Sequence, residues 1–220
     1  MLIDSFAAPM YATNCWVLAT EPGSECVVID PGMPDVSHQL SEILDKHDLK
    51  PVAVIATHGH LDHTFSIQPI ADGYQIPTYI HSEDRAFLSQ PENLHGPEFA
   101  ATLLGMNFSE SKDVRELRNG ETISLVGLNF KTIHAPGHTR GSLMFEVSGE
   151  VLISGDVLFA GSIGRTDLPT GSAKDMEETL RKKVVPLADH LRVLPGHGPE
   201  TTMAREKKSN PYLKNLVGRY

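Results

Sequence analysis

Four side chains that can bind a metal ion stand within six residues of one another in this sequence. They are His58, His60, Asp62 and His63, arranged as H-x-H-x-D-H. Imidazole and carboxylate groups are the usual ligands of zinc and related first-row ions. Gly59 gives the backbone the freedom to turn sharply between the first two histidines. The cluster therefore predicts a metal-binding loop.

Three further candidate ligands lie in the second half of the chain. Four ligands on one loop cannot all face one ion with good geometry, so a second set is required. His138, Asp156 and His197 each follow a predicted strand, and each has a glycine immediately before it. Because α/β folds usually build their chemistry at strand ends, we expect these side chains to join the first cluster in one metal centre.

The order of these motifs resembles that of the metallo-β-lactamase superfamily over nearly the whole chain. Residues 164–167 and 194–198 are similar to segments of its glyoxalase II (hydroxyacylglutathione hydrolase) branch, especially the short bacterial members. The resemblance implies an α/β fold built as a four-layer αβ/βα sandwich. It also implies two divalent metal ions, with Asp156 bridging both. The implied ligands are His58, His60 and His138 for one ion, and Asp62, His63 and His197 for the other.

Two neighbouring cations would activate a shared water for attack on a carbonyl carbon and stabilise the oxyanion that develops. No G-x-S-x-G motif supplies a separate nucleophile. The resemblance then implies a thioester hydrolase, acting on 2-hydroxyacyl (lactoyl) thioesters such as S-lactoylglutathione. Asp62 and Asp156 are its expected catalytic residues. We expect zinc as the metal, although these ligand types also accept iron and manganese.

The thiol portion of the substrate is less well defined by the resemblance. Glutathione-using glyoxalase II enzymes carry a C-terminal helical domain, whereas only 23 residues follow His197 here. Arg165 could bind a substrate carboxylate bidentately, or it could pair with Asp167 and hold the loop. The expected partner is a small-molecule thioester, with glutathione contributing little of the binding energy.

Two other functions are compatible with the same residues. Persulfide dioxygenases, as the resemblance implies, hold one iron with two histidines and one aspartate, here His58, His138 and Asp156. A non-enzymatic metal-binding domain is the third possibility. Seven ligands around a water-accessible site exceed what a closed structural zinc needs, which disfavours that reading.

The bulk composition is typical of an ordinary globular protein, and 220 residues suit a single domain over 1–220. A formal net charge of −9 argues against nucleic acid and anionic membranes as partners. The N-terminus lacks a basic, then apolar start, and no apolar run could span a bilayer, so we expect a cytoplasmic protein. Cys15 and Cys26 show no metal or redox spacing and are expected to pack as small hydrophobes. The oligomeric state is left open.

The elements that must position the ligands follow from turn residues and apolar patterns. Helices are expected at Val36–Lys46, from the cap Ser82 through Leu88, at Asp175–Val185, and from Thr201 onward. Strands are expected at Leu2–Ala7, Cys15–Ala19, Cys26–Ile29, Val52–Ala56, Pro77–Ile80, Glu121–Leu125, Leu128–Ile133, Ser142–Val147, Val151–Ile153 and Arg192–Leu194.

Residues 91–112 are the least regular stretch. Their prolines and glycines, together with apolar residues such as Phe99, Leu103 and Met106, predict either a mobile cover over the site or a helical insert packed on the sandwich. His134, four residues before His138, is a candidate for supporting a ligand.

Overall fold

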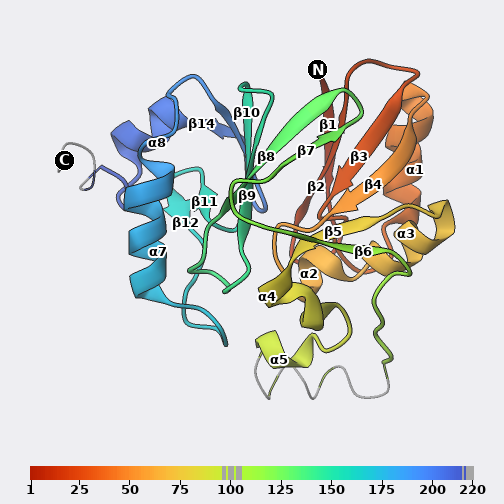
Figure 1. The fold of residues 1–220 in the computed structure, drawn as a ribbon, viewed down its shortest axis with the longest axis horizontal. Helices are drawn as coiled ribbons and strands as arrows, with labels where there is room; N and C mark the ends of the chain where they lie inside the picture. Colours follow the sequence, from red (N-terminus) through yellow and green to blue (C-terminus); the bar gives the residue numbers. More distant parts are fainter. Residues whose placement is uncertain (96–97, 99–101, 103–105, 215, 217–220) are drawn as a thin grey trace.

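Two six-stranded sheets stack face to face, and helices cover both outer faces (Figure 1). This computed structural model describes residues 1–95, 98, 102, 106–214 and 216. The layer order is helices, sheet, sheet and helices, which is the four-layer αβ/βα sandwich predicted from the sequence. Each sheet is therefore buried on both faces, which explains why its central strands are apolar along their whole length.

The first sheet has the strand order β1-β2-β3-β4-β5-β6. The pairs β1/β2 and β2/β3 are antiparallel, and the remaining pairs are parallel. The carboxyl ends of β3, β4 and β5 consequently meet at one edge. The strands are β1 (Leu2–Ala7), β2 (Asn14–Ala19), β3 (Glu25–Ile29), β4 (Lys50–Ile55), β5 (Thr78–His81) and β6 (Val114–Leu117).

The second sheet has the order β14-β13-β10-β9-β8-β7, with only β10 and β13 parallel among its described pairs. A two-stranded ribbon, β11 (Leu158–Phe159) with β12 (Ser162–Ile163), follows β10. The strands are β7 (Thr122–Leu125), β8 (Leu128–His134), β9 (Leu143–Val147), β10 (Val151–Gly155), β13 (Arg192–Pro195) and β14 (Thr201–Thr202).

Helices α1 and α3 lie on the first sheet, α7 and α8 lie on the second, and the short α2, α4 and α5 follow β4 and β5 at the lower edge in Figure 1. The helices are α1 (Ser37–His47), α2 (Leu61–Thr64), α3 (Ile67–Tyr74), α4 (Ser82–Arg85), α5 (Glu92–His95), α7 (Ala173–Thr179) and α8 (Met203–Ser209).

Three apolar layers hold the four structural layers together. Successive residues of β2 point to opposite faces of the first sheet, as the strand period requires. Val17 packs toward α1 and α3, whereas Trp16 and Leu18 pack between the sheets against residues such as Phe130 and Phe145. Cys15 and Cys26 are fully buried in the first of these layers, as predicted, and burial raises the pKa of the Cys26 thiol to about 12.

Several element boundaries differ from the predictions. The helix after β5 is capped by His81, whose Nδ1 accepts a hydrogen bond from the Glu83 backbone, so the prediction of Ser82 as the cap was wrong. The predicted helix Asp175–Val185 begins at Ala173, and its last turn, Leu180–Val184, is π-helical. The tail from Thr201 starts as strand β14 before α8 begins.

Part of the irregular stretch 91–112 is described. Helix α5 buries Leu94 completely, and Met106 is exposed. Phe99 and Leu103, on which the prediction of a cover or insert depended, lie outside the described residues. Among the described helices, none has both the length and the apolar character needed to cross a lipid bilayer.

Candidate metal centre

Loops at the ends of four strands bring the seven predicted ligands into one cluster. The segment from His58 to His63 follows β4 of the first sheet, while His138, Asp156 and His197 follow β8, β10 and β13 of the second. Candidate ligand atoms lie within 4.8 Å of one another in each of three groups, of which two share no member and the third, His58, His63 and Asp156, overlaps both. The first ligand group is His58, His60 and His138, and the second ligand group is Asp62, His63 and His197.

The outer nitrogens of three histidines hold their rings in place. His63 Nδ1 lies 2.9 Å from Asp30 Oδ2, His138 Nδ1 lies 2.7 Å from the Arg165 carbonyl, and His197 Nδ1 lies 3.1 Å from the Tyr11 carbonyl. Because all three partners can only accept, each Nδ1 carries the proton. The Nε2 atom of each ring therefore faces the centre and is the position at which a metal ion would bind.

The nitrogens of the first ligand group converge on one small volume. His60 Nδ1 lies 3.0 Å from His58 Nε2 and 2.7 Å from His138 Nε2. One ring nitrogen cannot donate a single proton to two acceptors at once. Burial and the neighbouring histidines lower the pKa of His58 and of His60 well below the usual range, so both rings are neutral. Three converging imidazole nitrogens, two of them on neutral rings, are suited to a cation.

The carboxylate of Asp156 lies between the two groups. Its Oδ1 is 3.4 Å from His63 Nε2, and its Oδ2 is 3.5 Å from both His138 Nε2 and His197 Nε2. Oδ1 is buried and has no hydrogen-bond partner. A buried carboxylate oxygen without a donor is costly unless a cation lies beside it. The position and the unpartnered oxygen both fit a bridging metal ligand.

Asp62 belongs to the more open side of the centre. Thr13 Oγ1 donates to Asp62 Oδ2 at 2.8 Å, and the same oxygen lies 3.3 Å from His197 Nε2 and 3.5 Å from His63 Nε2. Burial opposes the ionisation of Asp62, but His63 and these hydrogen bonds outweigh it and lower its pKa strongly. Asp62 is therefore an anion that can accept protons or bind a cation.

The negative charge around His63 favours a cation in the second ligand group. Burial disfavours a protonated ring, but the carboxylates of Asp156, Asp62 and Asp30 outweigh burial and hold the pKa of His63 well above its usual range. A site that attracts a proton so strongly also attracts a divalent ion that replaces the proton. The donor set of both groups consequently fits two metal ions.

Asp30 is the residue of this centre that the sequence pattern did not reveal. Its carboxylate accepts from the Thr57 backbone at 2.8 Å and from Thr57 Oγ1 at 2.6 Å, in addition to its contact with His63. The Thr57 hydroxyl, donating to Asp30, is left to accept from His58 Nδ1 at 3.0 Å. In the sequence, Asp30-Pro31-Gly32 was interpreted only as a turn that ends a strand. An acidic residue directly after β3 could have indicated that Asp30 belongs to the metal centre.

A cavity of about 370 Å³ opens over the centre. Tyr11, His95, Arg165 and Leu168 line it together with ligands from both groups. His95, the last residue of α5, accepts a hydrogen bond from the Leu61 backbone at 3.0 Å, and its ring centroid lies 4.9 Å from that of His60. The size of the cavity suits a small molecule.

Arg165 reaches this cavity already paired. Its Nε and Nη2 donate to the two carboxylate oxygens of Asp167, at 2.7 and 2.9 Å, and both side chains are exposed. Of the two roles predicted for Arg165, pairing with Asp167 is the one that this structure shows. The His134 ring stacks on that of His81, with centroids 4.2 Å apart, and its Nε2 faces the Arg140 carbonyl, so these ring contacts are not with candidate ligands.

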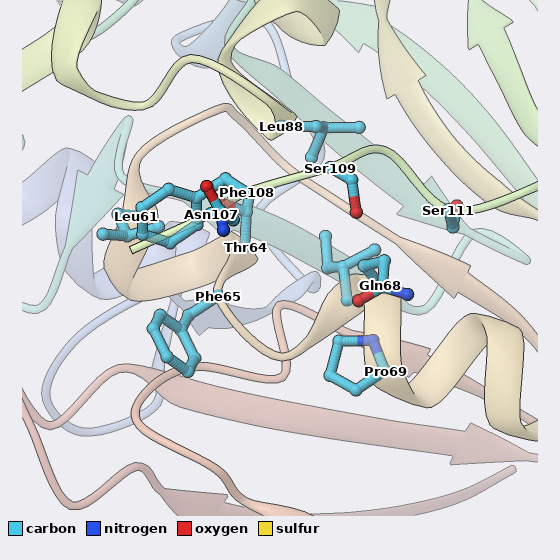
Figure 2. A pocket seen from close by; sticks show the side chains of 11 residues that line it. Leu61, Thr64, Phe65, Gln68, Pro69, Leu88, Asn107, Phe108, Ser109 and Ser111 are labelled. Atoms are coloured by element: carbon cyan, nitrogen blue, oxygen red, sulfur yellow. The ribbon is translucent and has the colours of Figure 1, made fainter. Parts of the chain in front are cut away.

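A second cavity, of about 190 Å³, lies beside α2 (Figure 2). Leu61 and Thr64 line it, whereas Asp62 of the same helix lines the cavity over the centre. Phe65, Leu88 and Phe108 give the second cavity an apolar wall, and Gln68 and Ser109 are among its polar side chains. It contains no candidate ligand of the centre, so the chemistry belongs to the first cavity.

Comparisons with known proteins agree with this geometry. The family model described as the metallo-beta-lactamase superfamily matches residues 8–197. An uncharacterized protein of Mycobacterium tuberculosis is 44% identical, covering 98% of this chain and 99% of its own length. The hydroxyacylglutathione hydrolase GloC of Haemophilus influenzae is 33% identical, covering 98% of this chain and 99% of its own length.

Solved structures show the same likeness. The crystal structure of BLEG-1 B3 metallo-beta-lactamase has a TM-score of 0.83 and 32% identity, covering 96% of this chain and 99% of that one. The crystal structure of TTHA1623 in a di-iron-bound form has a TM-score of 0.78 and 32% identity, covering 97% of this chain and 100% of that one.

Proposed function

This chain belongs to the metallo-beta-lactamase superfamily, and we propose that it is a two-metal thioester hydrolase acting on 2-hydroxyacyl thioesters such as S-lactoylglutathione. The observation that carries the proposal is the Asp156 carboxylate, which lies within 3.5 Å of ring nitrogens from both ligand groups. A single cation would need only one group, whereas this arrangement supports two cations that share one carboxylate.

The residues present fit two divalent ions. The first ligand group would hold one, the second ligand group would hold the other, and Asp156 would touch both. Such ions, when bound, lower the pKa of water to near neutrality and polarise a carbonyl group. We propose zinc, while the di-iron form of TTHA1623 is a reason to test iron as well.

The side chains of the centre set its charge. Asp62 and Asp156 both have pKa values lowered by the neighbouring histidines, despite burial, so both are anions at neutral pH. Two carboxylates cancel half of the charge of two divalent ions. The cavity therefore keeps a positive centre in a chain of net charge −9, which suits a carbonyl oxygen that becomes negative during the reaction.

Asp62 is the residue placed to orient the attacking water. The Thr13 hydroxyl donates a hydrogen bond to Asp62 Oδ2, and Asp62 lines the cavity. An ionised carboxylate in this position would accept a hydrogen bond from water and point the water oxygen toward a bound carbonyl carbon. Asp156, buried between the two groups, acts instead by holding their spacing.

A thioester is favoured because its leaving group needs little help. A thiolate departs without a strong general acid, and the cavity offers Tyr11, His95 and Leu168 rather than a lysine or a cysteine. GloC, which is named as a hydroxyacylglutathione hydrolase, supports the same substrate class. Because Asp167 already neutralises Arg165, we propose that the glutathione portion adds little binding energy.

Steady-state hydrolysis of lactoyl thioesters by the metal-loaded enzyme tests this proposal. S-lactoylglutathione should be hydrolysed, and trimming the thiol to smaller fragments should lower kcat/KM by less than about a hundredfold, or ~2.7 kcal/mol. A steeper loss would reveal a real glutathione site. Sulfite formation from glutathione persulfide by a form with one iron per chain would instead establish a dioxygenase. Cephalosporin hydrolysis without thioesterase activity would point to the reaction named for BLEG-1.

A further inference from the structure

Asp84, the last but one residue of α4, is a fully buried carboxylate with no role in the chemistry described above. It lies on the first sheet's side of the molecule, after β5. Burying an ionisable group in this way is costly unless several donors surround it. Burial raises the pKa of Asp84 above its usual value, although the surrounding hydrogen bonds oppose that rise.

The donors around Asp84 come from two separate ligand loops. Its Oδ2 accepts from the backbone N–H of Gly59 at 2.9 Å and from Thr139 Oγ1 at 2.6 Å. Its Oδ1 accepts from the backbone N–H of Gly141 at 2.8 Å. Gly59 stands between two ligands, His58 and His60, whereas Thr139 directly follows the ligand His138.

Close packing at the two glycines shows that this contact is built into the backbone. A Cβ at Gly141 would lie 2.5 Å from both Cγ and Oδ1 of Asp84, and a Cβ at Gly59 would lie 3.0 Å from the Asp84 carbonyl oxygen. The loop at Gly141 thus approaches Asp84 as closely as only glycine permits, and the loop at Gly59 also packs tightly against it. The carboxylate joins a loop of the first sheet to a loop of the second.

We propose that Asp84 is a positioning residue that sets the spacing between the His58–His60 loop and the His138 loop, and thereby controls metal affinity at the first ligand group only. This inference rests on the proposed metal centre. The second ligand group has supports other than Asp84: Thr13 donates to Asp62, and Asp30, which also reaches His58 through Thr57, contacts His63 directly. This group should therefore not depend on Asp84.

The amide of Asp84→Asn cannot replace the carboxylate. An amide has one acceptor oxygen, and its NH₂ group only donates. In one orientation the NH₂ faces the Gly141 N–H, and in the other it faces the Gly59 N–H. One backbone bond is therefore lost either way, and one of the two loops is released.

The test measures Zn²⁺ affinity with a competing chelator in two variants, each of which keeps only one ligand group intact. His197→Ala leaves the first ligand group intact, and His60→Ala leaves the second. Adding Asp84→Asn should weaken Zn²⁺ binding about 10- to 100-fold in the first background and less than about threefold in the second. Asp72→Asn is the control, because Asp72 likewise accepts both kinds of hydrogen bond, one from the Lys112 backbone and one from the Gln68 side chain, but contacts no ligand loop.

A second variant covers the case in which Asp84→Asn does not fold. Thr139→Val removes the hydroxyl that donates to Asp84 and contacts Ser142 Oγ at 2.8 Å, but it keeps both backbone contacts of Asp84. It should therefore weaken only the first ligand group, by a smaller factor. Amide exchange at either Gly59 or Gly141 should accelerate in metal-free Asp84→Asn, which loses one of the two backbone bonds. Equal losses in the two backgrounds, or no loss in the first, would overturn the proposal. Because no substrate is used, a chain that binds two ions but cleaves no thioester would refute only the proposed function.

Discussion

The first ligand group consists of three buried imidazoles, whereas the second contains a carboxylate, and its members Asp62 and His197 are partly exposed to the cavity. Their supports differ in the same way. The loops that carry the first group are held by the buried Asp84, which accepts hydrogen bonds from a loop of each sheet. The second is held partly by the N-terminal segment, because Thr13 donates to Asp62 and the Tyr11 carbonyl faces His197 Nδ1.

This difference suggests a division of work between the groups. Neutral nitrogens in a closed setting hold a cation firmly without cancelling its charge. A group with a carboxylate and an open side can exchange water and admit a substrate. Asp156 lies beside both groups, so its removal should affect the entire centre, while a change to Asp84 or to Thr13 should affect one group only.

Asp156→Asn should have the largest effect because it removes the shared anion. We expect kcat/KM for the thioester to fall at least about a thousandfold, or ~4 kcal/mol, together with a loss of bound metal. The apolar layers do not involve this side chain, so circular dichroism should show a folded chain. Turnover close to that of the parent would refute the bridging role.

Gly196→Ala should come next. An added Cβ would overlap Asp156 Oδ1 and lie 2.8 Å from His63 Cε1, so the bridging carboxylate and one ligand of the second group must both move. We expect a loss of about a hundredfold in activity, or ~2.7 kcal/mol. Gly73→Ala, on α3 where an added Cβ meets no atom within 4 Å, is the control and should leave activity intact.

Thr13→Val sharpens the comparison by acting on the second group alone. It removes the hydroxyl that donates to Asp62 Oδ2, and it should weaken Zn²⁺ binding by about tenfold in the His60→Ala background. Binding in the His197→Ala background should stay the same. Thr13→Ser keeps the hydroxyl and should behave like the parent. A similar loss in both backgrounds would mean that the two groups are not supported independently.

Asp4→Asn should have the smallest effect and no effect on either group. Burial opposes ionisation of Asp4, but hydrogen bonds from Lys46 and His47 outweigh it and lower its pKa. The ionised side chain therefore stabilises the fold above the unfolded pKa of about 3.9, and this contribution disappears as pH falls through the folded pKa. Urea unfolding should show a deficit below about 1 kcal/mol at pH 7 and none near pH 2.

Sequence patterns anticipated the ligands better than their supports. His58, Asp156 and the other ligands each follow an apolar strand, and strand ends gather at one edge of a stacked pair of sheets. Asp30 and Asp84 act on partners 25 to 57 residues away, and a single aspartate in a turn or short helix also has ordinary explanations. Contacts between residues so far apart in the sequence depend on how the elements pack, so no local sequence pattern predicts them.

The elements that the sequence did not reveal have physical reasons as well. Strand β6 is an edge strand that carries Arg115 and Glu116 with little apolar alternation, so nothing distinguished it from a loop. Helix α3 contains Pro69 and Gly73, which weaken a helical pattern, yet its Ile67 and Ile70 pack on the first sheet. The cap at His81 replaced the expected Ser82 because an imidazole nitrogen can accept the same hydrogen bond.

The most direct test of the account is a titration of metal-free protein with Zn²⁺ while S-lactoylglutathione hydrolysis is followed. The bridging position of Asp156 predicts that activity rises until two equivalents are bound and then levels off. Full thioesterase activity at one equivalent, or none at two, would contradict a two-metal hydrolase.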